Sequence, residues 1–388
     1  MQHNARYLSN LTPLRGIAAL LVAVFHFEMV AARFVPATQT LFFEKSYIMV
    51  DLFFIMSGFI MLHVYGEGFA KAVTREGFRK FLVARFARIY PLHIFTLLLM
   101  ILCFTVLMPG PTMPDGIENP AAIPTNIFLL QSFGIHKLYS WNIPAWSISA
   151  EWWAYMIFPF LALFTGRKKW LSAIVLFCVV VAAYGYIMYL APRKNNPLHN
   201  NINTTFDYGY LRGLAGFISG MLVYGLYRWA SFNKVAGKDL ATLLIGILLV
   251  AALHSGANDG LIVILFAALV LNFATNTGYL HKICNNRVLQ YLGDISYSIY
   301  LMQIFLQEPF SKGLRLPGTI GVGRGKQNIA FADGALYCVA YLLALVAISS
   351  LTYYFVERPC RRFINRKWNG ENKGETMPQA VILTQPRS

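Results

Sequence analysis

Long apolar runs follow one another along almost the whole chain, and short segments rich in Lys and Arg separate them. A helix that crosses the hydrocarbon core of a bilayer needs about 20 apolar residues, and most of these runs have that length. The pattern predicts an all-α protein, a polytopic bundle of about ten transmembrane helices. The expected spans are residues 12–33, 47–65, 89–108, 141–164, 170–191, 206–229, 240–254, 260–276, 290–308 and 335–356.

The composition agrees with a membrane protein. Of the 388 residues, 57% are hydrophobic and only 13% are charged, which is about half the charged fraction of a soluble domain. The net charge of +16 does not indicate nucleic-acid binding, because the basic residues cluster in the short segments between apolar runs. Far more of them fall on the side of the N-terminus than on the other side, so the positive-inside rule places both termini in the cytoplasm. We expect a multi-pass protein of the inner (cytoplasmic) membrane, in contact with membrane lipids.

The expected division of the chain is simple. Residues 1–365 form one transmembrane domain, and residues 366–388 are polar, lack periodicity and are expected to be a disordered cytoplasmic tail. The five cysteines show no CxxC spacing, so neither a disulfide framework nor a metal site is predicted.

Charged groups inside spans are costly and are therefore candidates for function. Arg15 and His26 lie eleven residues apart in the first span, which Thr12 and Pro13 begin as a helix cap and a first-turn proline. Eleven residues make about three full helical turns, so both side chains share one face, about 16 Å apart along the axis. Arg15 is expected at the cytoplasmic end and His26 in the outer half.

Two carboxylates are the next candidates. Asp51 begins the second span at a depth similar to that of His26, where it could orient the imidazole, although a helix-start acid at the interface is an alternative. Glu151 lies deep in its span and shares a helical face with Ser147, four residues earlier. A buried glutamate needs a partner, for which Arg212 or another buried polar group are the options, and a purely structural ion pair is the alternative to a catalytic role.

A basic segment at residues 78–91 precedes the third span, and we expect it to be an inner loop. Its arginines, Arg85 and Arg88 among them, suit phosphate groups, because a guanidinium presents a planar fork of donors. The alternative is that this charge only sets the topology or contacts lipid headgroups.

These segments resemble the acyltransferase 3 family of membrane acyltransferases, in the order in which that family has them. The resemblance covers nearly the whole chain. The matching pieces are LRGIAALLVAVFH (14–26), VDLFFIMSGFIM (50–61), RFARIYPLH (85–93), WSISAEWWAYMIFP (146–159), YLGDISYSIYLMQ (291–303) and VERP (356–359).

The resemblance implies O-acylation, most often O-acetylation, with acyl-CoA and first of all acetyl-CoA as donor. It implies as acceptor a hydroxyl of a cell-surface or exported carbohydrate, or of a small secreted molecule. The family's Arg–His pair falls on Arg15 and His26, and its basic segment falls on Arg85 and Arg88. Where relatives commonly have a second histidine this chain has Gln303, which cannot carry a proton near neutral pH.

The family's serine–glutamate motif falls on Ser147 and Glu151. In the mechanism that we expect, Arg15, Arg85 and Arg88 bind the donor, and His26 is the general base, oriented by Asp51 or Glu151. Direct transfer and a covalent acyl-enzyme both fit the sequence.

The main alternative is a transporter or flippase of a lipid-linked or acylated molecule, because buried charges also line transport pathways. A homo-oligomer, or an association with glycan-synthesis proteins, is compatible with the sequence.

Overall fold

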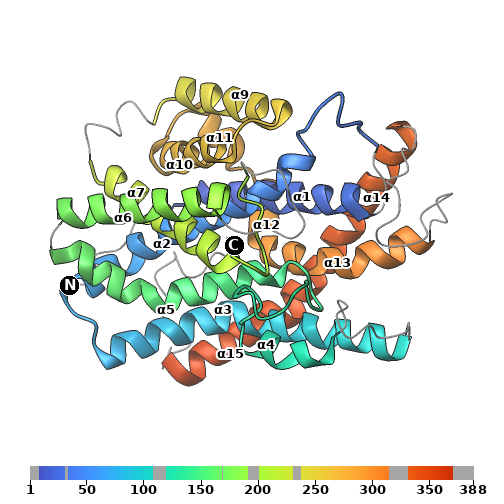
Figure 1. Ribbon diagram of the computed structural model, residues 1–388, viewed down its shortest axis with the longest axis horizontal. Coiled ribbons are helices and arrows are strands. Elements are labelled where there is room, and N and C mark those ends of the chain that lie inside the picture. The colour runs from blue at the N-terminus through green and yellow to red at the C-terminus, as the bar shows by residue number, and fades with distance from the viewer. Residues whose placement is uncertain are drawn as a thin grey trace.

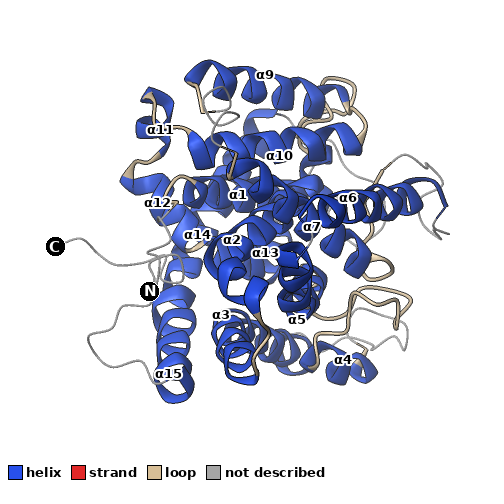
Figure 2. Ribbon diagram, turned by 90° about the vertical axis from the view of Figure 1, so that its left-hand side faces the viewer, coloured by secondary structure: helices blue, strands red, loops and turns tan. Residues whose placement is uncertain are grey.

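The structure is a computed structural model that describes residues 8–30, 34–107, 119–167, 169–190, 201–229, 237–313 and 331–369. Within these ranges every regular element is a helix and there is no strand (Figure 2). The predicted all-α class is confirmed for the part of the chain that the structure describes.

Ten longer helices make up the bundle in the part of the chain that the structure describes. They are α1 (Leu11–Val30), α2 (Met49–Lys71), α3 (Arg75–Leu102), α5 (Ala145–Arg167), α6 (Lys169–Gly185), α7 (Gly209–Tyr227), α9 (Asp239–Ser255), α10 (Asp259–Thr275), α13 (Ser296–Gly313) and α14 (Phe331–Thr352). Shorter helices connect or extend them: η1 (Glu44–Ile48), η3 (Pro120–Ala122), α4 (Ile123–Ile127), α11 (Tyr279–Cys284), α12 (Arg287–Asp294) and α15 (Arg358–Asn369). Single π-helical turns end α3, α6 and α14 at Cys103–Leu107, Tyr186–Leu190 and Tyr353–Glu357.

Six helical segments of the described residues are long and apolar enough to cross a bilayer, so the chain is a membrane protein. They are Leu11–Met29, Glu44–Lys71, Arg75–Val106, Ala145–Gly166, Trp170–Leu190 and Phe331–Asn369. The apolar helices α9 and α10 have 17 residues each, which is short for a full span. The count of ten spans and the side of each terminus stay predictions.

The basic segment before the third span is helical, so its assignment to a loop is wrong. Helix α3 begins at Arg75, where the Thr74 side chain caps it by accepting a hydrogen bond from the Gly77 N–H at 3.1 Å. The residues that follow are good helix formers, and Pro91, the single proline of α3, lies inside the helix without ending it. Arg85 and Arg88 therefore project from one rigid helix, three residues apart.

One predicted span and the predicted C-terminal tail also differ from the structure in their boundaries. The segment expected as one span at 290–308 breaks after Asp294 into α12 and α13. At the other end of the chain, α14 passes through its π-helical turn into α15, which ends at Asn369. The predicted tail therefore begins inside a helix, and its residues from 370 on lie outside the described residues.

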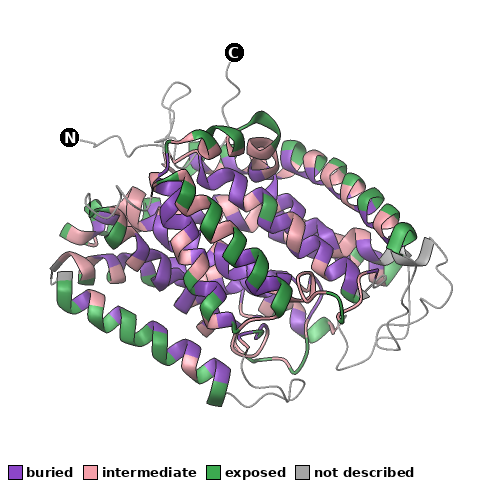
Figure 3. Ribbon diagram, turned by 90° about the horizontal axis from the view of Figure 1, so that it is seen from above, coloured by how far each residue is buried: buried purple, intermediate pink, exposed green. Residues whose placement is uncertain are grey.

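Helices α1, α2 and α13 run through the middle of the bundle, with α9 and α10 on one side and α3 and α15 on the other (Figures 1 and 2). Buried residues concentrate in these central helices, while peripheral helices expose apolar faces (Figure 3). Such faces are expected where a helix meets lipid rather than protein.

The contact between α2 and α7 is closer than ordinary side chains allow. A Cβ atom at Gly58 would lie 1.8 Å from Phe217 O, and one at Gly220 would lie 1.9 Å from Ile55 O. Small residues at such crossings let two membrane helices approach backbone to backbone. This packing fixes α2, which carries Asp51 next to Arg212 of α7 and Ser57 next to Glu151 of α5.

Candidate active site

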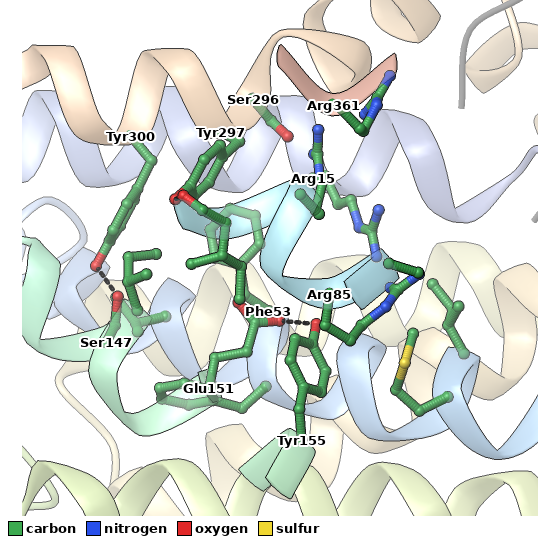
Figure 4. Close-up of a pocket in the computed structure, with 18 residues that line it drawn as sticks. Arg15, Phe53, Arg85, Ser147, Glu151, Tyr155, Ser296, Tyr297, Tyr300 and Arg361 are labelled. Atoms are coloured by element: carbon green, nitrogen blue, oxygen red, sulfur yellow. Dashed lines mark hydrogen bonds between the residues drawn. The ribbon is translucent and has the colours of Figure 1, made fainter. Parts of the chain in front are cut away.

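One cavity of about 110 Å³ lies inside the bundle, enclosed by α1, α2, α3, α5, α13 and α15 (Figure 4). We call it the active-site cavity. It brings together five of the seven residues that the sequence singled out, from segments far apart along the chain: Arg15, Arg85, Arg88, Ser147 and Glu151. His26 and Asp51 do not line it.

Arginines gather at one end of this cavity, where Arg15, Arg85 and Arg361 come from three different helices (Figure 4). Arg85 is 7% exposed, and its Nη2 donates to the Tyr65 hydroxyl at 3.2 Å. Its guanidinium also lies over the Tyr65 and Tyr155 rings, 5.5 and 5.8 Å from their centroids. Aromatic and hydroxyl groups thus hold this cation without neutralising its charge.

Arg88 has a different environment. Its Nη1 donates to Glu357 Oε1, and the other oxygen of Glu357 accepts from Ser298 Oγ at 2.9 Å. Arg361 Nη1 stands 3.8 Å from the same carboxylate, which is only 1% exposed. Two arginines therefore share one buried carboxylate, and Asp294 also interacts with Arg88, Arg361 and Arg15. Since Arg85 adds a further cation, the arginine end still has more cations than carboxylates, which suits an anionic ligand.

Hydroxyl groups mark the other end of the cavity. Ser147 Oγ lies 2.8 Å from the Tyr300 hydroxyl and 3.0 Å from Pro144 O, and the Tyr300 hydroxyl is 3.3 Å from the same carbonyl (Figure 4). Both hydroxyls are buried, and their protons can turn toward a ligand oxygen because each has more than one acceptor in reach.

Glu151 lies between the two ends. Its Oε1 accepts hydrogen bonds from Ser57 Oγ at 2.7 Å and from the Tyr155 hydroxyl at 2.6 Å, and these two hydroxyls are 2.9 Å apart (Figure 4). Of the two options considered from the sequence, Arg212 and another buried polar group, the structure gives Glu151 the second. Two hydroxyl donors on one oxygen compensate the partly buried carboxylate instead.

Asp51 is the partner of Arg212. Arg212 Nη2 and Nε donate to Asp51 Oδ2 at 2.6 and 3.1 Å, and the two side chains are 0% and 1% exposed. Arg212 also donates to the backbone carbonyls of Thr204 and Tyr47. The structure thus places Asp51 in a buried bidentate ion pair and not against His26, because a buried carboxylate is most stable with a forked donor.

His26 is buried on α1, toward α13. Its Nδ1 lies 3.0 Å from Val22 O. A carbonyl can only accept, so Nδ1 carries the proton and Nε2 keeps its lone pair. The Gln303 side chain lies against this imidazole, and Gln307 Nε2 donates to His26 O.

The residues on this face of α13 connect the cavity with His26. Ser296, Tyr300, Gln303 and Gln307 follow at spacings of four, three and four, so they share one face of the helix. Ser296 and Tyr300 line the active-site cavity, and Gln303 and Gln307 continue the line to His26. The general base expected from the sequence is therefore beyond the hydroxyl end of the cavity and not inside it.

Several groups of this site were not predicted from the sequence. Tyr155 lies four residues after Glu151, a spacing that could have revealed it, and Tyr300 lies inside the matching segment 291–303. Arg361 lies four residues after Glu357 of the VERP segment, also one helical turn. Among the described residues, no three His, Cys, Asp or Glu side chains come together in a way that could hold a metal ion.

The geometry describes a membrane enzyme site with a cationic end and a hydroxyl end, and sequence comparison identifies its class. The acyltransferase 3 family model, described as an acyltransferase domain, matches residues 9–354, so the chain belongs to this family and is an acyltransferase. It is similar to the acyltransferase MdmB of Streptomyces mycarofaciens, with 26% identity over 379 residues that cover 93% of each chain. It is also similar to protein 2 in the picA locus of Rhizobium radiobacter, with 42% identity over 153 residues, which are 36% of this chain and 73% of that protein. No solved structure matches it significantly.

Proposed function

We propose that this acyltransferase is an O-acyltransferase of the inner membrane that transfers an acyl group, acetyl in the first instance, from acyl-CoA to a carbohydrate hydroxyl. The observation that carries this proposal is the polarity of the active-site cavity. Arginines stand at one end and hydroxyls at the other, and His26 of α1 lies beyond the hydroxyls, beside α13, with its Nδ1 against Val22 O and its ring against Gln303. Acyl-CoA matches this arrangement, because its anionic phosphates lie at one end of the molecule and its thioester lies at the other.

The donor enters from the arginine end. Arg15, Arg85 and Arg361 attract its phosphates, and the thioester comes to rest near Ser147 and Tyr300. Hydroxyls at this place can donate hydrogen bonds to the oxyanion that forms when the thioester carbonyl is attacked. A well-placed hydrogen-bond donor to the oxyanion raises the reaction rate by about 10²- to 10³-fold.

The acceptor hydroxyl approaches His26 from the outer side. Nε2 takes its proton while the oxygen attacks the thioester carbonyl carbon. The tetrahedral intermediate collapses, the carbon–sulfur bond breaks, and the proton on Nε2 passes to the leaving thiolate. The products are the acyl ester and free CoA, and His26 returns to its neutral form.

Gln303 assists this proton transfer. Its Nε2 donates to Tyr300 O at 2.9 Å, whereas its buried Oε1 has no hydrogen-bond partner among the described residues. Neutral His26 offers no second N–H, but the imidazolium does. A hydrogen bond from Nε2–H to Gln303 Oε1 then stabilises the cation at the moment it forms. Glutamine thus replaces the usual histidine of the family as an acceptor that never titrates.

The test is His26→Gln, which keeps size and polarity but removes the base. Purified protein in nanodiscs is supplied with acetyl-CoA and a panel of sugars, and thiol release and ester formation are measured per folded molecule. We expect turnover to fall by about 10²- to 10⁴-fold with CoA binding unchanged. Gln303→Met should lower turnover less, by roughly tenfold, without changing the KM for the donor. Wild-type turnover in His26→Gln would contradict the assignment of the base.

A transporter is the competing class for the same buried charges. Membership in an acyltransferase family argues for the enzyme, and the comparison of thiol release with substrate flux across a vesicle separates the two functions.

A further inference from the structure

Helix α15 carries a high density of positive charge. Five of its 12 residues are Lys or Arg, and none is Asp or Glu. It follows α14 and its π-helical turn, and the 22 residues of α14 extend over about 33 Å, which already crosses the hydrocarbon core of a bilayer. The charged helix therefore begins close to the level at which a span reaches the lipid headgroups.

The inward face of α15 belongs to the region of the active-site cavity. Arg361 and Asn365, one helical turn apart, are 7% and 6% exposed. Arg361 lines the cavity beside Glu357, and Asn369 Nδ2, another turn along, donates to Lys80 O of α3 at 3.3 Å. This face packs against α3 at the edge of the bundle (Figure 2). The position of Arg361 in the cavity thus depends on how α15 lies on α3.

The outward face of the same helix is exposed and basic. It carries Arg362, Phe363, Arg366 and Lys367. None of its three cations pairs with a carboxylate of the described residues. Lys367 Nζ lies 5.8 Å from the centroid of the Phe363 ring and 5.6 Å from that of Trp368, and both aromatic side chains are more than half exposed. Exposed aromatic rings among cations are typical of a helix that lies in the interface of a bilayer.

The spacing of the cations makes this helix depend on a counter-charge. Arg358, Arg362 and Arg366 follow one another at intervals of four residues, and like charges at this spacing destabilise a helix. A positive-inside bias requires cations near the end of a span, but it does not require them to share an exposed face with aromatic rings. A second copy of this basic face would repel the first. The complement of the face is therefore an anionic surface at the level of the headgroups.

We propose that the outward face of α15 binds the headgroups of anionic phospholipids, and that these lipids hold α15 against α3 so that Arg361 stays at the active-site cavity. Clusters of about four or more Lys and Arg beside a span bind anionic leaflets in this way. The headgroup of phosphatidylcholine carries its own cation and has no net charge to offer. Lipid binding is independent of the proposed function, whereas its effect on catalysis rests on that function, because it is measured with acetyl-CoA as donor.

The first experiment measures which lipid lies beside α15. The full chain is placed in nanodiscs of equimolar phosphatidylcholine and phosphatidylglycerol, with bromine on the acyl chains of one lipid or of the other. The fluorescence that Trp368→Phe removes is that of Trp368, and its quenching by the two brominated lipids is compared. A single cation near an anionic surface favours the anionic lipid by about fivefold, so we expect at least this preference for phosphatidylglycerol in the wild type.

A variant with Arg362→Gln, Arg366→Gln and Lys367→Gln should lose this preference. The matched control removes three exposed cations from other helix ends, by Lys238→Gln, Lys282→Gln and Arg287→Gln, and should keep it. Equal quenching by both lipids in the wild type, or an unchanged preference in the α15 variant, would overturn the headgroup site. An equal loss in the control would also overturn it, because net charge and not the face of α15 would then select the lipid.

Kinetics with acetyl-CoA and the panel of sugars test the link to Arg361. In nanodiscs of phosphatidylcholine alone, the KM of the wild type for acetyl-CoA should be roughly tenfold higher than in the mixed nanodiscs, which is the effect of one hydrogen bond to a charged group, while kcat stays close to its value there. The α15 variant should show the higher KM in both. A KM of the wild type that does not depend on the lipid would overturn the link to Arg361. If no nanodisc supports turnover, the proposed function fails, and the quenching alone decides the headgroup site.

Discussion

Replacing Arg85 and Arg88 by Met in separate variants should change different properties of the protein. The two residues lie three positions apart on α3, and both line the active-site cavity. No feature of the sequence distinguishes these two arginines. Their partners in the structure differ, because Arg85 contacts Tyr65 and Tyr155, whereas Arg88 pairs with the buried carboxylate of Glu357.

Arg85→Met should weaken donor binding and leave the fold intact. No carboxylate loses its partner in this variant, and the Met side chain fills most of the space of the arginine stem. A hydrogen bond to a charged group contributes about 1.5–3 kcal/mol, which corresponds to roughly a 10- to 150-fold rise in the Kd for CoA. Loss of the two cation–π contacts should cost stability about 1–2 kcal/mol.

Arg88→Met should instead destabilise the protein. The side chain of Glu357 is 1% exposed, and without Arg88 its remaining cationic partner among the described residues is Arg361 at 3.8 Å. Removing one partner of a buried ion pair costs roughly 3–5 kcal/mol, because the other charge remains buried and uncompensated. The double variant Arg88→Met with Glu357→Gln should regain most of this loss, since it removes the orphaned charge.

Thermal unfolding in detergent and CoA titration, both on each purified variant, separate these outcomes. The apparent Tm should fall by several degrees in Arg88→Met, recover in the double variant, and fall less in Arg85→Met than in Arg88→Met. Equal Tm values for the two single variants would refute the distinction between the arginines. An unchanged Kd in Arg85→Met would show that the arginine end does not bind the donor.

Two further predictions concern the rest of the bundle. Asp51→Asn leaves Arg212 buried without its counter-ion and should lower the free energy of unfolding by about 3–5 kcal/mol, whereas Asp51→Asn combined with Arg212→Met should lower it less. Thermal unfolding of the wild type and both variants measures this difference, and a fully stable Asp51→Asn would show that the ion pair is dispensable. Reporter fusions at Gly116 and Gly370 should lie on opposite sides of the membrane, with Gly370 in the cytoplasm, and two fusions on the same side would contradict the ten-span topology.

Helical class and membrane residence followed from the sequence because both depend on local properties. The length of each apolar run decides whether a helix can span a bilayer. The shared face of Ser147 and Glu151, four residues apart, also follows from helical periodicity, and both residues do line one cavity. The start of α3 was missed, since the basic residues that precede the apolar run are good helix formers and Thr74 caps them.

The pairing of charges could not be read from the chain. Asp51 and Arg212 are 161 residues apart, and Arg88 and Glu357 are 269 apart, and no periodicity connects positions on different helices. Glu151 and Asp51 look equally suited to Arg212 in the sequence. Only the crossing of α2 and α7, where Gly58 and Gly220 let the backbones touch, decides that Asp51 meets the arginine.

The position of His26 also depends partly on the sequence and partly on the tertiary structure. Its place on the face of Arg15 was determined by the spacing of eleven residues within one helix. That this face meets α13, and that Gln303 and not a carboxylate lies against the imidazole, was decided by tertiary packing. The sequence therefore determined which helices form and which residues are costly to bury, because these are local free energies. The tertiary structure determined which of those residues compensate one another, because that depends on contacts between helices far apart in the chain.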